Sequence, residues 1–366
     1  MKAIKKFLNR LFIDGLSGMA SGLFATLIIG TIIQQIGTAI GGNVGGIIFT
    51  LGKVAASLMG AGIGCGIAAK FGEKPLVTLS AAVAGMIGAF ASKILAGTVV
   101  SGAVVSYAGP GEPMGAFVAA YVGIELGRLV AGKTKLDIIL TPIVTIGTGA
   151  AAGLLAGPYI SQFMTWLGSL INWGTEQQPV VMGIVVSVLM GIFLTLPISS
   201  AAIGVALGLN GIAAGAAVAG CCANMVGFAV ASYRENKFGG LVAQGLGTSM
   251  IQMPNIVRNP FIWIPSIVKK PIIWLPAIIA SAVTGPVSSA LLGMVNNSTG
   301  AGMGTAGLVG QIMGYQSMTA AGVEPAVALI EIAAVHFILP AIIAFGVSEA
   351  MRKLKIIKSG DMKLEV

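Results

Sequence analysis

Residues 322–347 read GVEPAVALIEIAAVHFILPAIIAFGV. From Pro325 onward this stretch is long enough to cross a bilayer, whose hydrocarbon core of about 30 Å requires about 20 apolar helical residues. Residues 322–347 nevertheless contain Glu324, Glu331 and His336. Ionisable groups at membrane depth are costly, so they usually face a bundle interior or a watery cavity and mark a pathway. The stretch therefore predicts a membrane-spanning helix and favours transport.

Similar apolar runs recur along the chain from Thr26 to Val347. Of the 366 residues, 56% are hydrophobic and only 9% are charged, and the mean hydropathy is +0.95. These values exclude an ordinary soluble domain and predict an all-α polytopic membrane protein. No small-residue cleavage site follows the first apolar run, so we expect a retained first helix rather than a signal peptide.

Positive charge gathers at both ends of the sequence, which has a net charge of +9. Lysines and an arginine precede the first apolar run, and four more basic residues follow the last: Lys2, Lys5, Lys6 and Arg10, then Arg352, Lys353, Lys355 and Lys358. This distribution predicts cytoplasmic termini and an even number of crossings of a bacterial cytoplasmic membrane. No basic fold module accompanies the charge, so we expect no nucleic acid partner.

Three regions follow from these patterns. Residues 1–15 are expected to form a cytoplasmic amphipathic helix, residues 16–350 the transmembrane domain, and residues 351–366 a basic cytoplasmic tail. We expect about ten transmembrane helices, near 16–40, 44–69, 75–100, 114–131, 137–157, 179–197, two between 198 and 234, 271–295 and 325–347. Residues 161–178 suggest an outer interfacial helix, and residues 239–253 and 300–307 suggest two re-entrant hairpins, which must be buried in protein or line a cavity.

Glycine and cysteine have mainly structural interpretations. The 54 glycines are about twice the usual fraction, and segments such as Gly60–Gly64 allow close packing of helices. Cys65, Cys221 and Cys222 lie in apolar segments of small residues and fit no metal-binding spacing. We therefore expect buried thiols, with neither metal nor cofactor.

Two Glu-Pro motifs supply the first candidate solute ligands. Glu112 and Glu324 each stand directly before a proline that opens an apolar helix. Proline is favoured at the first helical position, which leaves each glutamate at the cap, beside free amides and the positive end of the helix dipole. A carboxylate held there can accept solute hydroxyls. A simple structural cap is the alternative.

The last span and several amides supply further candidates. Glu324 and Glu331 are seven residues apart, only about 20° from eclipsed on an ideal helix, so both can face one cavity. His336 either packs in the helix or contacts solute or a proton. Asn224, Gln244, Gln252 and Asn255 could bind a sugar hydroxyl or cap broken helices.

The chain resembles the enzyme IIC membrane subunits of phosphotransferase-system sugar transporters, and in particular their PfoR-like branch, which is named for a toxin regulator. The similar stretches are GAFVAAYVG at 115–123, LTLPISSAA at 194–202, SYREN at 232–236, QGLGTSM at 244–250 and GAGMGT at 300–305. The resemblance covers about residues 10–350. It implies an elevator-type transporter, a homodimer, and a solute site with a carboxylate and a histidine.

By the same resemblance, Glu324 corresponds to the glutamate of the family motif Gly-Ile-Thr-Glu-Pro. The chain reads AGVEP at 321–325 and lacks the threonine. The short tails and cytoplasmic loops contain neither the cysteine nor the histidine that phosphoryl transfer requires. Any IIA and IIB functions must therefore come from separate chains, and we identify no catalytic residue here.

Three functions remain open. The first is a permease for a small, sugar-like solute, coupled or not coupled to phosphorylation. The second is a membrane regulator that binds a ligand without net transport. The third is an ion-coupled carrier of a non-sugar solute, with Glu331 and His336 as proton sites.

Overall fold

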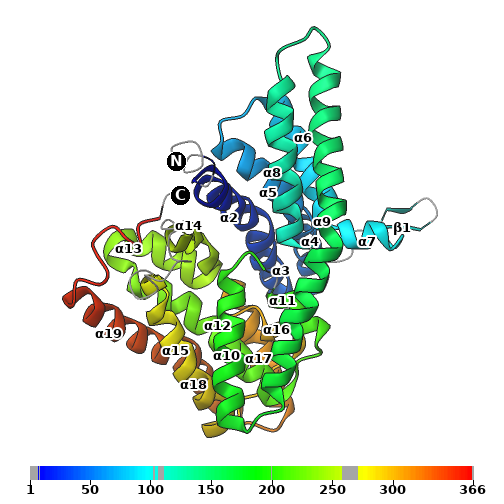
Figure 1. Ribbon diagram of the computed structural model, residues 1–366. Helices are drawn as coiled ribbons and strands as arrows, with labels where there is room; N and C mark the ends of the chain where they lie inside the picture. Colours follow the sequence, from blue (N-terminus) through cyan, green and yellow to red (C-terminus); the bar gives the residue numbers. More distant parts are fainter. Residues whose placement is uncertain are drawn as a thin grey trace. The chain divides into compact units, whose positions relative to one another are not determined.

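The computed structural model describes residues 7, 9–101, 104–105, 111–198, 200–257 and 271–364. The chain divides into two compact units, Met1–Met164 and Thr165–Glu365. Each unit is described by itself, and Figure 1 gives the labels of the helices.

Unit 1 opens with one long helical span over Ile13–Ile40. The π-helix η1 (Arg10–Gly15) leads into α2 (Leu16–Leu23), the π-helix η2 (Phe24–Ile28) and α3 (Ile29–Ile40). Helices α4 (Gly42–Ser57) and α5 (Met59–Lys70) follow and meet at a 53° bend. The expected spans near 16–40 and 44–69 are both present as helices.

Unit 1 continues with α6 (Pro75–Ala89), α7 (Ala91–Leu95) and α8 (Pro113–Val130). Between α7 and α8, the two-residue strands β1 (Val100–Ser101) and β2 (Val104–Val105) pair antiparallel. Helix α9 (Asp137–Thr175) begins in unit 1. It contains Pro142 and Pro158 in its interior. No separate helix begins after residue 157, because α9 continues beyond Pro158 to Thr175, although an interior proline removes a backbone donor and crowds the preceding turn. The interfacial position of residues 161–178 stays a prediction.

Small residues bring the unit 1 helices into close contact, as the sequence predicted. A Cβ atom added to Gly22 would overlap the carbonyl of Gly62, and one added to Gly64 would overlap the carbonyl of Ala81. Backbones can approach this closely only where side chains are absent. The prediction for Gly60–Gly64 is confirmed.

Unit 2 is built around α12 (Gly211–Ala231), most of which is buried. Helices α10 (Pro179–Thr195), α15 (Leu275–Pro286) and α19 (Leu339–Lys353) pack against it. Cys221 and Cys222 are buried in α12 and carry free thiols. The remaining elements are short: α11 (Ser200–Ala206), α13 (Tyr233–Val242), η3 (Ala243–Gly247), η4 (Ser249–Gln252), α14 (Met253–Val257), η6 (Pro271–Ile273), η7 (Val287–Leu291), α16 (Ser298–Ala301), η8 (Ala306–Leu308), α17 (Val309–Ala320), α18 (Pro325–Ala333) and the π-helix η9 (Ala334–Ile338).

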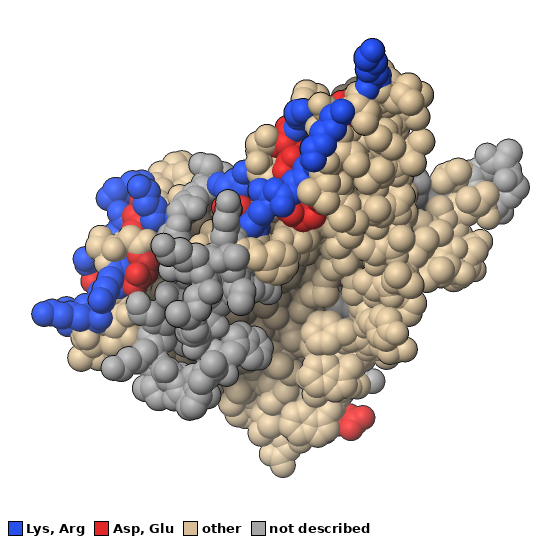
Figure 2. Space-filling view, turned by 45° about the horizontal axis from the view of Figure 1, so that its top comes forward, with Lys and Arg blue, Asp and Glu red and all other residues tan. Residues whose placement is uncertain are grey.

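The described residues contain five helices long and apolar enough to cross a membrane, or six when the bent α4–α5 pair is one span. Three shorter apolar helices accompany them, at Pro75–Ala89, Pro179–Thr195 and Leu275–Leu291. Figure 2 shows charged side chains clustered in patches, with broad uncharged surface elsewhere. The all-α polytopic class is confirmed, whereas the count of ten crossings stays a prediction.

One local part of the topology was wrong. Two crossings were expected between residues 198 and 234, but only α12 is long enough there, because α11 has seven residues. Seven helical residues rise only about 10 Å. The two predicted hairpin segments do interrupt the helices: residues 243–252 form short π- and 3-10 turns, and residues 302–308 separate α16 from α17.

Candidate functional site

Three interruptions of helices in unit 2 meet at one place, which we call the interruption site: residues 196–200, 243–252 and 302–308. Pro197 ends α10, and glycines punctuate the other two segments. The Ser200 hydroxyl donates to the carbonyl of Gly302 at 2.7 Å. The hydroxyls of Thr195 and Ser249 are 2.8 Å apart, and η3 contacts η8. Interrupted helices of this kind expose backbone groups that can bind a solute.

Glycine is required at one of these interruptions. Gly304 has φ = +55°, and a Cβ atom there would lie 2.9 Å from the backbone of Cys221 in α12. A side chain is disfavoured both by this backbone conformation and by the close approach. The GAGMGT stretch therefore places its backbone directly against the central helix.

Asn224 lies at the centre of a buried hydrogen-bond network. Its amide donates to the Ser281 hydroxyl at 2.8 Å, and its oxygen accepts from the Trp274 indole at 2.8 Å and from Thr195 at 3.3 Å. Asn224, Ser281 and Thr195 are fully buried. The Trp274 indole therefore contributes a donor to this interior network.

Gln244 and Asn255 belong to a second network, which we call the amide network and which also includes Gln252. Gln244 donates to the Ser232 hydroxyl at 2.8 Å and accepts from Gln252 Nε2 at 2.8 Å. Asn255 Nδ2 donates to Gln252 Oε1 at 2.9 Å. Gln244 and Gln252 are fully buried. Uncharged donors and acceptors in series are suited to a neutral, hydroxyl-rich solute.

The two Glu-Pro motifs have the same local structure but different surroundings. Glu112 and Glu324 are the N-cap residues of α8 and α18, with proline in the first turn of each helix, as expected. The Glu112 carboxylate accepts from the Met114 amide at 3.5 Å and is partly buried. Burial raises the pKa of the Glu112 carboxyl to about 7, although the Met114 amide lowers it.

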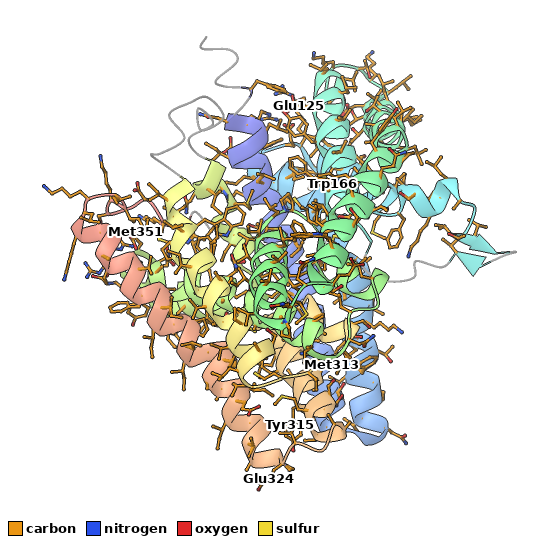
Figure 3. All side chains as sticks on the ribbon, turned by 60° about the horizontal axis from the view of Figure 1, so that its bottom comes forward. Glu125, Trp166, Met313, Tyr315, Glu324 and Met351 are labelled. Atoms are coloured by element: carbon orange, nitrogen blue, oxygen red, sulfur yellow. The ribbon has the colours of Figure 1, made fainter. Side chains whose placement is uncertain are left out.

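Glu324 is exposed and makes no side-chain cap bond. Figure 3 shows it at the end of α18, at the opposite end of the α18–α19 segment from Met351. Glu112 belongs to unit 1, whereas Glu324 belongs to unit 2 with the other candidates.

His336 lies in the π-helix η9 and is 1% exposed. Its Nδ1 atom is 3.1 Å from Gln311 Nε2, which also lies 3.2 Å from the Cys222 sulfur. His336 Nε2 and Gln311 Oε1 are buried and have no hydrogen-bond partner among the described residues. Glu331 is half-buried one turn before η9. The π-helical turn begins after Glu331 and includes His336, so it changes the helix register between these two side chains.

Thr195, Ser249 and Gln311 were missed as candidates in the sequence. Gln311 carried the same signal that singled out Gln244 and Gln252, an amide in an apolar segment. Thr195 and Ser249 carried no such signal, because hydroxyls in apolar helices commonly bond to the preceding turn. Among the described residues, no three His, Cys, Asp or Glu side chains are grouped so as to hold a metal ion.

Apolar helices of spanning length, with interrupted segments packed around a buried central helix, define an all-α polytopic membrane protein of the transporter type. The chain matches the family described as phosphotransferase system, EIIC, over residues 13–268 and 264–364. It therefore belongs to this family of sugar-transport permease subunits. No curated protein is significantly similar to the chain. Membership of the PfoR-like branch stays a prediction.

Proposed function

We propose that this permease subunit moves a small, neutral carbohydrate across the bacterial cytoplasmic membrane by elevator-type movement, and that separate IIA and IIB proteins carry out any phosphorylation. The observation that carries the proposal is the meeting of three helix interruptions beside buried hydroxyl and amide side chains. Neutral sugars are recognised by donors and acceptors of this kind, which do not require the solute to carry charge.

We assign solute binding to the interruption site and to polar side chains around it. Asn224, Gln244 and Asn255 supply amides, and His336 supplies an imidazole whose Nε2 atom lacks a hydrogen-bond partner in the described part of the chain. In unit 2, Glu324 and Glu331 on the α18–η9 helix are the proposed carboxylate acceptors. Glu112 in unit 1 is proposed as a separate solute contact. A solute that bonds to these groups would replace bonds that water or protein provides in its absence.

A thermal-shift screen of the detergent-purified chain against monosaccharides, disaccharides, sugar phosphates and organic anions tests this function. A ligand of the folded state raises the unfolding midpoint by mass action. We expect a neutral sugar to raise it, and Glu324→Gln and Thr195→Val to reduce that shift. Thr50→Val is the matched control, because Thr50 is an exposed helical residue that bonds only to the Gly46 carbonyl among the contacts described.

A shift produced only by organic anions would contradict the sugar assignment and favour the ion-coupled carrier. In that case Glu331→Gln should abolish dependence of uptake on a pH gradient. Unchanged sugar uptake in a deletion strain with altered gene expression would instead favour the regulator.

A further inference from the structure

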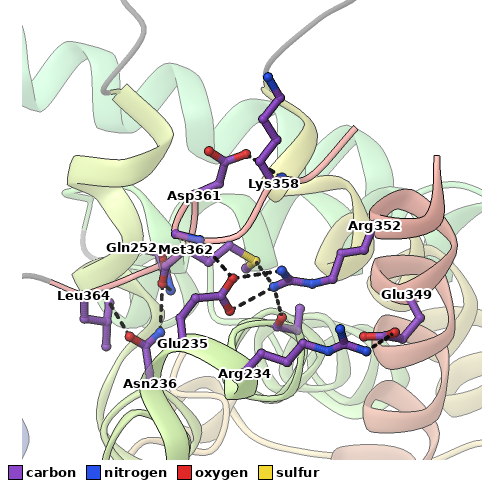
Figure 4. Close-up of polar contacts among 12 residues, drawn as sticks. Arg234, Glu235, Asn236, Gln252, Glu349, Arg352, Lys358, Asp361, Met362 and Leu364 are labelled. Atoms are coloured by element: carbon purple, nitrogen blue, oxygen red, sulfur yellow. Dashed lines mark hydrogen bonds and ion pairs between the residues drawn. The ribbon is translucent and has the colours of Figure 1, made fainter. Parts of the chain in front are cut away.

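Residues 357–364, which we call the latch, fold back onto unit 2 beside the amide network (Figure 4). Met362 is fully buried, and Ile357 is 2% exposed. Both side chains lie in an apolar cluster with Phe228, Ala231, Ile273, Ala277 and Met351. The basic cytoplasmic tail expected over residues 351–366 stays a prediction. Within it, Ile357 and Met362 are buried, whereas Lys358 and Lys363 are exposed.

Side-chain amides hold the backbone of the latch. Asn236 Nδ2 donates to the Met362 carbonyl at 2.8 Å, while Asn236 Oδ1 accepts from the Leu364 amide at 2.9 Å. One asparagine thus pairs with the latch as a neighbouring strand would. Because both bonds go to backbone atoms, they select an extended chain rather than particular side chains.

Two members of the amide network complete this contact. Gln252 Nε2 donates to the Met362 carbonyl at 3.1 Å, and Asn255 Nδ2 donates to the Lys363 carbonyl at 2.9 Å. Gln252 Nε2 also donates to Gln244 Oε1. The latch therefore occupies donors of the same network that we assign to the solute.

A buried ion pair fixes the position from which the latch turns back. Arg352 donates two hydrogen bonds to the Glu235 carboxylate, at 2.8 and 2.9 Å, and these side chains are 10% and 5% exposed. The Gly360 amide lies 3.4 Å from Glu235 Oε1. Gly360 has φ = +91°, a conformation that side chains disfavour and that turns the chain toward Asn236.

We propose that the latch is a displaceable intramolecular cover, which must leave the amide network before Gln252 and Asn255 can bind a solute. On opening, the amides and the latch backbone can exchange their mutual bonds for bonds to water or solute, so opening requires only local unfolding. The identity of the solute rests on the proposed function, whereas the covering of the network does not.

Thiol labelling of a Gln252→Cys reporter in the full chain tests the cover. Met362→Asp should open the latch, because an unpaired carboxylate is costly in the apolar cluster. We expect modification of Cys at position 252 by N-ethylmaleimide to become about tenfold faster or more in this variant. Met362→Leu conserves the volume and character of the side chain and should leave the rate unchanged. Equal rates in all three proteins would overturn the proposal.

Cys221 and Cys222 provide an internal control for folding, since both are fully buried in α12. They should stay unmodified while position 252 reacts. If Met362→Asp exposes them, Asn236→Ala serves as the opening variant, because it removes two bonds to the latch without placing a charge in the core. An unchanged rate at position 252 in Asn236→Ala would equally contradict the cover.

The solute response is measured separately. For a sugar that stabilises the native chain, Met362→Asp should enlarge the thermal shift at a fixed sub-saturating concentration, and Met362→Leu should not. If labelling becomes faster but the sugar-induced thermal shift is unchanged, the latch does not have to leave the amide network for the sugar to bind. This result would overturn that part of the proposal. If no sugar stabilises any variant, the proposed function fails, and the labelling result still decides whether the latch covers the network.

Discussion

At the scale of single residues, identical motifs acquire different chemistry from their surroundings. Glu112 and Glu324 both cap a helix that starts with proline. Glu112 is partly buried and has the Met114 amide as a partner, whereas Glu324 is exposed. The local motif was therefore predictable, but the raised pKa of the Glu112 carboxyl depends on how much of the protein covers it.

The raised pKa of Glu112 predicts a pH-dependent stability. Between its ordinary value of 4.5 and about 7, this carboxyl binds more protons in the folded than in the unfolded state. The free energy of unfolding should therefore decrease as pH rises through this window. Glu112→Gln should reduce that decrease and raise the unfolding midpoint above pH 7, as measured by thermal unfolding in detergent.

Glu324→Gln is the matched control, because Glu324 is an exposed cap of the same type. It should leave in place the pH dependence that Glu112 confers. A profile that Glu112→Gln does not change would show that the Glu112 carboxyl titrates near its ordinary pKa.

At the scale of elements, the interruptions of the helices decide where polar groups gather. Pro197 and the glycines of residues 302–308 end helical hydrogen bonding, and the freed backbone groups find partners on neighbouring interruptions, as in the Ser200–Gly302 bond. The positions of the breaks could be read from proline and glycine. Their meeting in space could not, because it depends on packing against α12.

Gly304→Ala tests the importance of this geometry. Its φ of +55° and the Cβ position 2.9 Å from Cys221 should make alanine destabilising by about 1–3 kcal/mol. We expect a lower unfolding midpoint and a weaker sugar-induced shift. Gly346→Ala is the control, since a Cβ there meets nothing within 4 Å and alanine favours a helix. Equal midpoints for the two variants would contradict a constrained interruption.

At the scale of the whole molecule, the basic residues at both ends of the sequence predict cytoplasmic termini. Reporter domains that are active only in the cytoplasm, fused before Met1 or after Val366, should both be active. A matched pair of fusions to a reporter active only outside the cytoplasm should both be silent. Opposite results at the two ends would require an odd number of crossings.

The homodimer implied by the family resemblance is also a proposal at this scale. The molar mass of the purified chain, measured by light scattering with the detergent contribution subtracted, distinguishes a dimer from a monomer of 36.8 kDa.

The sequence alone determined the class of the protein, the positions of most long apolar helices and the interruptions at Pro197 and Gly304. Hydropathy and helix breaking are properties of short stretches of sequence, so both can be read along the chain without knowing how the helices pack. Errors arose where local signals were ambiguous. Pro158 lies inside α9 instead of ending a helix, and the apolar run after residue 198 contains one long helix where two were expected.

Only the tertiary structure decided which polar groups meet. Asn224 pairs with Trp274, and Asn236 pairs with Met362 across 126 positions of sequence. Nothing in either local sequence specifies such a partner, because the choice depends on which helices pack together and which buried donors would otherwise lack an acceptor. The same long-range packing brings the backbone of residues 362 and 363 against Gln252 and Asn255 of the amide network.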